Sequence, residues 1–347
     1  MMKHNPGDDG IVCIDLGYTP FMDRWMLMSF LDLYVRPTLT FAGSEHEFEN
    51  ADYIIVGVPF DNTSSYRTGS RFAPHAIREA SLNIEGFSFR SNRSIDDLRI
   101  HDAGDLNISL KVEETLRRLE LVTKEIIEAG KIPVLIGGEH TLTIGSVKAV
   151  DKPFKLLCFD AHLDLRDEYL DMKFSHATVI RRIFETNKNL EDVIIIGARA
   201  ACKEEIEYAK KNRIHIISSR EILNGNIRDS SSKVNRLIED AKALYLSLDM
   251  DVLDPAFAPA VQTPEPDGIS TNQLLNLLSE INLDRLVAFD ITETTPPYDF
   301  GVTSAVAAKI IFEVLLLKEL SFHDCRFVSE QNGHQKRDKG KRGEEIK

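Results

Sequence analysis

Short runs of apolar residues recur along the chain and alternate with stretches that have helical spacing. The runs are rich in β-branched side chains, and several are apolar at almost every position. Such runs predict strands that are buried on both faces of a sheet. They cover residues 53–58, 132–136, 156–159, 193–196, 214–217, 244–248 and 286–289.

The stretches between these runs place apolar residues three and four positions apart, as one face of a helix requires. The clearest covers residues 112–129 and is followed by Gly130, a stop signal. The others cover 74–80, 177–184, 203–211, 232–241, 271–281 and 304–317. Because strands that alternate with helices form right-handed βαβ units, the sequence predicts a three-layer α/β/α fold with a central, mainly parallel sheet.

The chain has 347 residues and shows no internal repeat or low-complexity linker. That length suits one large α/β domain, which we expect over residues 36–328. Residues 1–35 are expected to form an N-terminal extension. Residues 329–347 are dense in charged residues and glycine, and are predicted to form a disordered tail. No segment is predicted to span a membrane.

Charge and cysteine content narrow the class of protein. The formal net charge is −13, which argues against a nucleic-acid binder because such a protein would normally show a basic face. The four cysteines are scattered without a CxxC pair, so we expect free thiols in a reducing, cytoplasmic compartment. They are Cys13, Cys158, Cys202 and Cys325.

Acidic residues follow four of the predicted strands. The segments are GGEH (137–140), DAHLD (160–164), DMDVLDP (249–255) and DITE (290–293). In a parallel sheet, ligands bind just beyond the carboxyl ends of the strands. None of the four segments contains Lys or Arg, so carboxylates gathered there would repel one another unless a bound cation compensated them. One such motif alone is more often a helix cap or a loop acid, but their joint occurrence favours a metal site.

The spacing within these segments indicates which side chains share a direction. Residues two apart in an extended segment point the same way, so the first, third and fifth residues of DAHLD can face one side, as can both acids of DMD. An oxygen-rich ligand set suits Mn²⁺ better than structural zinc. Six ligands are more than one ion needs, and we therefore expect two Mn²⁺ ions per subunit. The candidate ligands are His140, Asp160, His162, Asp164, Asp249 and Asp251.

The same segments resemble the signature segments of the ureohydrolases, the arginase and agmatinase family. GGEH, DAHLD and SLDMDVLDPAFAP (247–259) are similar to its three metal motifs. The agmatinase-like segments are GVPFDNTSSYRTGSRFAPHAIREAS (57–81), DAGDL (102–106), SHATVIRR (175–182) and FDITETTPPYD (289–299). The resemblance covers about residues 36–320 and implies the arginase-like α/β/α fold and a homo-oligomer, a trimer or a hexamer.

The resemblance also implies how the ligands are shared. One ion would be held by His140, Asp160, Asp164 and Asp249, and the other by Asp160, His162, Asp249 and Asp251. Asp160 and Asp249 would then bridge the two ions. Two close cations lower the pKa of a water that they share, and Asp164 could accept a hydrogen bond from that water. Glu139 stands where the family often has Asp, and it is not a ligand.

Three further residues match family positions with catalytic or substrate-binding roles. Glu293 resembles the guanidinium-binding glutamate, and the alternative is a surface acid. His176 resembles the proton-shuttle histidine, whose ordinary pKa suits that task, and the alternative is a histidine at a helix N-terminus after Ser175. Thr263 aligns with a substrate-side threonine, and the alternative is a turn residue.

The sequence leaves the substrate open. The loop over residues 165–176 is similar to the agmatinase version and favours agmatine, which would be hydrolysed to putrescine and urea. Residues 170–172 and 260–268 depart from the family pattern where Gly and other small residues are common. Another guanidino or formimino compound therefore remains an alternative, such as guanidinobutyrate, arginine or formiminoglutamate. A third possibility is a member of the family that binds metal but has no activity.

Overall fold

Every apolar run that predicts a strand lies in one sheet of the computed structural model, which describes residues 29–339 and the side chains as far as residue 320. The strands of this sheet are β1 (Val35–Arg36), β2 (Tyr53–Val58), β5 (Ile100–Leu106), β6 (Ile132–Gly137), β7 (Phe154–Phe159), β8 (Leu190–Ala198), β9 (His215–Ser218), β10 (Leu244–Asp249) and β11 (Leu286–Thr292). A separate hairpin joins β3 (Phe87–Ser88) and β4 (Arg93–Ser94).

The order in the nine-stranded sheet is β1-β5-β2-β6-β11-β10-β7-β8-β9. All neighbours are parallel except the edge pair of β1 and β5. The four strands that precede the acidic segments are β6, β11, β10 and β7, and they are consecutive in this order. The fold therefore brings the four segments together at the middle of one sheet edge.

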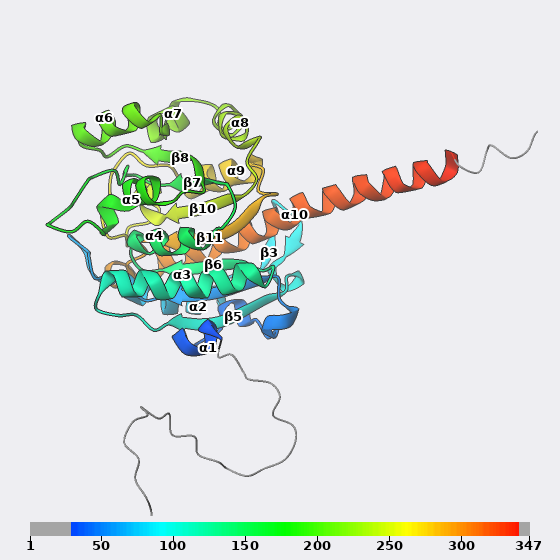
Figure 1. Cartoon of the computed structure of the whole chain (residues 1–347), viewed down its shortest axis with the longest axis horizontal. Coiled ribbons are helices and arrows are strands. Elements are labelled where there is room, and N and C mark those ends of the chain that lie inside the picture. Colours follow the sequence, from blue (N-terminus) through cyan, green and yellow to red (C-terminus); the bar gives the residue numbers. More distant parts are fainter. Residues whose placement is uncertain (1–28, 340–347) are drawn as a thin grey trace, which may run out of the picture.

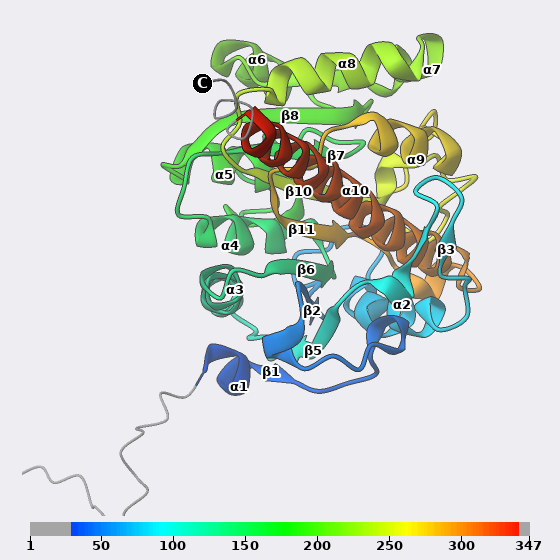
Figure 2. The ribbon, with the colours of Figure 1, turned by 90° about the vertical axis from the view of Figure 1, so that its right-hand side faces the viewer.

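Helices cover both faces of the sheet (Figures 1 and 2). One core cluster joins one face to α2 (Ala73–Ser81), α7 (Ser219–Asn224), α8 (Ile227–Ile238), α9 (Thr271–Glu280) and α10 (Val302–Lys339). A second joins the other face to α3 (Val112–Glu128), α4 (Thr143–Ser146), α5 (Val179–Thr186) and α6 (Lys203–Asn212). Every residue of β2, β7 and β10 is buried, as strands covered on both faces must be. The predicted three-layer architecture is confirmed.

The ends of the chain lie partly outside the described residues. The predicted boundary at residue 36 falls within β1, and α1 (Phe30–Tyr34) packs against α3 through a hydrogen bond from Leu31 N to Glu125 Oε2 of 3.1 Å. Residues 1–28 of the predicted extension and 340–347 of the predicted tail are outside the description. The division into extension, domain and tail stays a prediction.

Two of the four cysteines can be examined, and Cys158 and Cys202 are free thiols. Cys13 and the side chain of Cys325 lie outside the described part of the chain. Among the described residues, we find no helix with the length and apolar character that crossing a membrane requires.

Strand β5 has no apolar run to predict it, because its sequence IHDAGDL carries two acids. The buried Arg78 of α2 compensates them. Its guanidinium lies 2.7 Å (Nε to Oδ2) and 2.9 Å (Nη2 to Oδ1) from Asp102 and 2.5 Å (Nη1 to Oδ1) from Asp105, and Nη2 donates to Gly104 O at 3.0 Å. A polar strand is stable inside this sheet because a cation from another element neutralises it.

We predict that Arg78→Leu strongly destabilises the fold, because it leaves the Asp102 carboxylate buried without its counter-ion. The expected loss in the free energy of unfolding is about 3–5 kcal/mol, measured by urea denaturation. The control is Arg99→Leu, which removes an ion pair with Asp52 whose side chains are 60% and 43% exposed. Exposed pairs contribute little. Equal losses in the two variants would contradict this account of Arg78.

Candidate functional site

The GGEH segment leaves β6 through a turn that only glycine can make here. Gly138 N donates to Val58 O, and the next residue, Glu139, donates its N–H to Phe60 O at 2.7 Å. A Cβ on Gly138 would lie 1.9 Å from Phe60 O, so a side chain is excluded. The turn leads into a short 3₁₀ helix (His140–Leu142) that begins with His140.

Three carboxylates converge on one nitrogen of His140. Its Nδ1 lies 3.1 Å from Asp160 Oδ2, 3.0 Å from Asp164 Oδ2 and 3.5 Å from Asp249 Oδ2. Nδ1 is buried and nevertheless forms no hydrogen bond of acceptable geometry with a described residue. Nδ1 thus faces three carboxylate oxygens without forming a well-directed hydrogen bond to any of them, as expected of groups gathered around a cation.

A second convergence lies beside the first. His162 Nδ1 is 2.9 Å from Asp251 Oδ2 and 3.5 Å from Asp160 Oδ1. Among the described residues, these three form one of two groups of His, Cys, Asp or Glu whose ligand atoms all lie within 4.8 Å of one another. Asp160 therefore belongs to both convergences. Asp249 turns Oδ2 toward His140 and uses Oδ1 to accept the backbone N–H of Asp251 at 2.8 Å.

The charges at these two points are strongly coupled. Burial alone would lower the pKa of His140, but the Asp160 and Asp164 carboxylates raise it well above its usual range. Asp251 does the same for the pKa of His162 against the effect of burial. Burial and the Asp160 charge raise the pKa of Asp164 to about 7. Protonated imidazoles thus compensate the carboxylates when no metal is bound.

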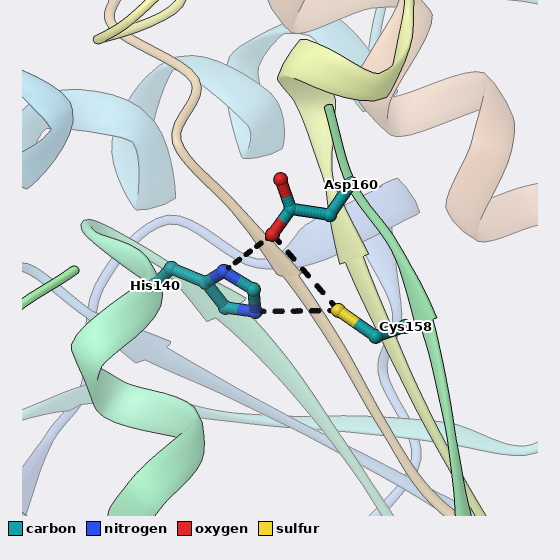
Figure 3. A group of neighbouring side chains, drawn as sticks. All are labelled: His140, Cys158 and Asp160. Atoms are coloured by element: carbon teal, nitrogen blue, oxygen red, sulfur yellow. Dashed lines mark hydrogen bonds and ion pairs between the residues drawn. The ribbon is translucent and has the colours of Figure 1, made fainter. Parts of the chain in front are cut away.

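The other group within 4.8 Å joins His140 and Asp160 to Cys158 (Figure 3), which the sequence predicts only as a core thiol. Cys158 Sγ lies 3.9 Å from His140 Nε2, whereas the carboxylates face Nδ1. Burial raises the pKa of this thiol to about 12, so it stays protonated. Since metals bind the thiolate, Cys158 fits a packing role behind the imidazole better than a ligand role.

A buried hydroxyl fixes the tautomer of His140. Ser247 Oγ donates to Asp290 Oδ1 at 2.6 Å, so it accepts at 3.0 Å from His140 Nε2. Asp290 Oδ2 accepts from Tyr245 at 2.6 Å and Thr143 at 2.9 Å. With its proton on Nε2, His140 leaves Nδ1 free to bind a metal. Such a partner orients the imidazole ligand.

Glu293 is buried, not a surface acid. Its Oε1 accepts the backbone N–H of His140 at 2.6 Å, while Oε2 is buried and has no hydrogen-bond partner among the described residues. Burial, with the nearby Glu139, raises its pKa well above the usual range. Both Glu293 (φ 68°) and Asp164 (φ 50°) adopt the left-handed conformation that non-glycine residues seldom take. Such strain often accompanies functional positions.

His176 begins a 3₁₀ helix (His176–Thr178) and is 9% exposed. Its ring lies between two hydroxyls: Nδ1 is 3.4 Å from Thr63 Oγ1, and Nε2 is 3.1 Å from Ser65 Oγ. The edge of Tyr169 packs on it with the ring centroids 5.5 Å apart. Burial and the positive charge of His162 lower the pKa of His176 to about 4, so it is neutral near pH 7.

A cavity of about 350 Å³ opens over these groups. Asp164, His176 and Thr263 line it, and Thr263 Oγ1 donates to Asp251 Oδ2 at 3.3 Å. Arg166 and Glu265 also line it, so both signs of charge surround the cavity. Other lining residues are Ser65, His162, Tyr169, Cys202, Glu205, Asp249 and Asp251. Glu293 is not among the lining residues, although it bonds the backbone of His140.

The loop departures have a backbone explanation. Tyr169 and Met172 pair as a tight hairpin, with Leu170 (φ 49°) and Asp171 (φ 63°) at its tip. Asp267 (φ 69°) is also left-handed, as expected for a residue that replaces one tolerant of positive φ. Gly or Asn is favoured at such positions.

In the loop over residues 260–268, Gln262 is fully buried and accepts from Ser64 Oγ at 3.0 Å. This departure from the family pattern therefore adds a hydrogen bond between the neighbours of two lining residues, Ser65 and Thr263, while Nε2 of Gln262 is buried without a partner among the described residues.

The structure thus brings together all six predicted ligands, with His176 and Thr263 at the cavity and Glu293 beside His140. The sequence reasoning missed Thr63, Ser65, Ser247 and the contact of Cys158. The sequence marks Asp290 only as an acid at a strand end and predicts no role for Glu139. The alternation within SLDMD did place Ser247 on the face of Asp249, which is the one signal that could have found it.

Known proteins agree with this architecture. A model of the arginase family matches residues 51–317. The chain is 36% identical over 272 residues to the agmatinase of Pyrococcus horikoshii (78% of this chain, 93% of the relative). It is 38% identical over 283 residues to the agmatinase of Bacillus subtilis (80% and 95%). The agmatine ureohydrolase of Thermoplasma volcanium superposes with a TM-score of 0.77 at 35% identity, covering 83% and 97% of the two chains. The chain therefore belongs to the arginase family and is a ureohydrolase-type enzyme.

Proposed function

We propose that this enzyme uses two Mn²⁺ ions to hydrolyse agmatine to putrescine and urea. The observation that carries the proposal is the double convergence of carboxylates on His140 Nδ1 and His162 Nδ1, with Asp160 in both. A buried nitrogen without a hydrogen bond, facing three carboxylate oxygens, fits a cation and little else. The oxygen-rich set favours Mn²⁺ over structural zinc.

The ligand roles follow the two convergences, except that the place of Asp249 at the second ion rests on the family resemblance alone. His140, Asp160, Asp164 and Asp249 would hold one ion, and Asp160, His162, Asp249 and Asp251 the other. Two such ions, when bound, supply a water of lowered pKa. Asp164 lines the cavity and can orient that water, because its carboxylate is directed at the first convergence.

Glu293 would bind the guanidinium group. One carboxylate oxygen is held by His140 N–H, and the other is buried without a partner among the described residues. A buried acceptor left unpaired costs free energy, which a planar cation donating N–H groups would recover. Bound in this way, the guanidinium carbon would be held still for attack by water.

His176 would manage the proton that the reaction needs. Cleavage of the guanidino C–N bond releases an amine, which must gain a proton. A neutral imidazole at the cavity wall can accept a proton from water and pass it to that nitrogen. Thr263, whose hydroxyl donates to Asp251, also lines the cavity and would contact the substrate there.

The acids near the cavity are the candidates to bind the end of the substrate that is not the guanidino group. Of the acids in the loop over residues 165–176, Asp167 pairs with Arg182 at 2.7 Å. Glu205 uses both oxygens on backbone N–H groups of Leu165 and Cys202. Neither Glu168 nor Asp171 lines the cavity. Glu265 does, 42% exposed and with Oε1 3.7 Å from His162 Nε2, and it is then the acid placed to meet the terminal ammonium of agmatine.

One observation favours a second substrate. Arg166 lines the same cavity and lies over the Tyr169 ring at 5.3 Å. A guanidinium at this place would attract a terminal carboxylate, as in guanidinobutyrate, and repel an ammonium. We also propose a single catalytic domain over residues 36–328, from the chain length and the family resemblance, and a cytoplasmic location, from the scattered cysteines. A trimer or hexamer is proposed from the family resemblance alone.

The deciding experiment measures urea release by the Mn²⁺-loaded protein from agmatine, guanidinobutyrate, arginine and formiminoglutamate, with ammonia and formamide followed for the last. We expect agmatine to give kcat/KM at least about tenfold above the others, because Glu265 complements its ammonium. A preference for guanidinobutyrate would assign the substrate through Arg166 instead. No turnover of any compound by protein with two bound ions would overturn the proposed activity.

The ligand assignment is tested by metal content. We predict that Asp160→Asn and Asp251→Asn each weaken Mn²⁺ binding by at least about tenfold, because an amide supplies less charge than a carboxylate. Asp160→Asn should reduce occupancy of both ions and Asp251→Asn mainly one, as measured by plasma mass spectrometry after dialysis. The control is Asp151→Asn, an exposed acid just before β7 at the opposite edge of the sheet. Full occupancy in both site variants would refute the assignment.

Metal binding should release protons. In the metal-free protein, neighbouring carboxylates hold the pKa of His140 and His162 above its usual range, and the pKa of Asp164 is about 7. A metal must displace these protons, so its affinity is expected to fall as the pH falls, on the order of tenfold per pH unit per proton displaced. Calorimetric titrations with Mn²⁺ in buffers of different ionisation enthalpy measure the protons. Uptake of protons, or an affinity independent of pH, would contradict the prediction.

A further inference from the structure

Glu139 is a buried acid that is neither a proposed metal ligand nor a lining residue of the cavity. It is fully buried next to His140 in the sequence, yet its carboxylate bonds to a different strand end. Its Oε2 accepts the backbone N–H of Thr63 at 2.7 Å, and its Oε1 accepts the Thr63 hydroxyl at 2.6 Å. The carboxylate thus holds Thr63 through both oxygens.

The Thr63 hydroxyl has one proton, and the distances show where it goes. Its Oγ1 is 2.6 Å from Glu139 Oε1 but 3.4 Å from His176 Nδ1 and 3.2 Å from Thr141 Oγ1. A hydroxyl donates preferentially to a carboxylate, because that bond is charge-assisted. Toward His176, Thr63 Oγ1 is therefore an acceptor, as it is for the His176 backbone N–H at 3.2 Å.

This direction determines the tautomer of His176. A neutral imidazole carries one proton, and Nδ1 must carry it to donate to Thr63. Nε2 is then bare and accepts from Ser65 Oγ at 3.1 Å. Ser65 and His176 both line the cavity, so the bare nitrogen lies where a proton would be exchanged.

We propose that Glu139 and Thr63 are positioning residues that fix His176 in the Nδ1–H tautomer, with Nε2 at the cavity ready to accept a proton. The inference rests on the role proposed above for His176. Thr63 contacts the imidazole directly, and Glu139 acts through Thr63. Without the pair, the ring could take the other tautomer and lose its basic nitrogen at the cavity.

The test compares Thr63→Val, which keeps the shape and removes the hydroxyl, with Thr63→Ser, which keeps the hydroxyl. With the substrate identified for the wild-type enzyme, we expect Thr63→Val to lower kcat by roughly tenfold to a hundredfold with KM within about threefold. Thr63→Ser should retain kcat within about threefold, since it can still donate to Glu139. The matched control is Thr123→Val, a fully buried threonine of α3 whose hydroxyl has no hydrogen-bond partner among the described residues.

A double-mutant cycle separates positioning from simple structural support. In a His176→Asn background, which lacks the shuttle nitrogen, Thr63→Val should change kcat by less than about twofold if it acts through His176. An undiminished effect there would overturn the inference, as would a Thr63→Val enzyme with wild-type kcat. Melting temperature and Mn²⁺ content are measured on each variant, and a kcat loss that tracks either of them would also overturn it.

The two proposals fail differently. A wild-type enzyme that hydrolyses none of the guanidino or formimino compounds refutes the proposed function. An active wild-type enzyme in which His176→Asn has no effect refutes the shuttle role. An active enzyme that needs His176 but not the Thr63 hydroxyl refutes only the positioning role. Glu139→Gln gives a second readout, because Thr63 donates its N–H and its hydroxyl to different oxygens of Glu139, and the amide NH₂ that replaces one of them cannot accept. It should therefore lower kcat as Thr63→Val does, and Glu139→Asp should partly restore it.

Discussion

The structure depends on negative charge concentrated in one buried place. Asp160, Asp164, Asp249 and Asp251 are each at most 6% exposed, and the ion pairs that they form are with His140 and His162. Buried carboxylates at such distances cannot all be ionised without positive charge among them. The raised pKa values of His140 and His162 are consequences of this one constraint. A cation relieves it, and cation chemistry is then available at the same point.

The middle of the sheet could be predicted because the burial of each strand leaves a pattern in that strand's own sequence. Strands such as β7 and β10 are covered on both faces and are therefore visible in the sequence as apolar runs. The acids that follow them lie at one edge of the sheet because the carboxyl ends of parallel strands meet there. Strand β5 could not be predicted in this way. Its acids are stable only because Arg78, which lies in α2, neutralises Asp102 and Asp105. A contact between distant parts of the chain leaves no periodic pattern in the sequence of the strand itself.

The residues of the candidate site also fall into those that the sequence could predict and those that it could not. The ligands around Asp160 could be inferred because they follow parallel strands that end side by side. The alternation of an extended segment does not explain their directions, because Asp251 lies in a 3₁₀ helix (Met250–Val252) and Asp164 has a left-handed backbone (φ 50°). Thr63, Ser65 and His176 come from two loops more than a hundred residues apart, and only the fold shows that they meet. Cys158 illustrates the reverse error. Its proximity to His140 is real, but it faces the nitrogen opposite to the carboxylates, so proximity alone would assign it a role that the geometry does not support.

His140 and His176 have different proposed roles, but each is held by the same arrangement of a hydroxyl and a buried carboxylate. His140 donates through Nε2 to Ser247, whose hydroxyl donates to the buried Asp290. His176 donates through Nδ1 to Thr63, whose hydroxyl donates to the buried Glu139. In each case the hydroxyl donates its only proton in a hydrogen bond to a carboxylate. The hydroxyl can then only accept from the imidazole, so the ring nitrogen that faces it must carry the imidazole proton. The outcome differs only in which nitrogen is left bare: Nδ1 of His140 faces the carboxylates, and Nε2 of His176 faces the cavity. A carboxylate that does not touch the imidazole thus sets its tautomer through a hydroxyl, and the other ring nitrogen stays free for the metal in His140 and for a proton in His176.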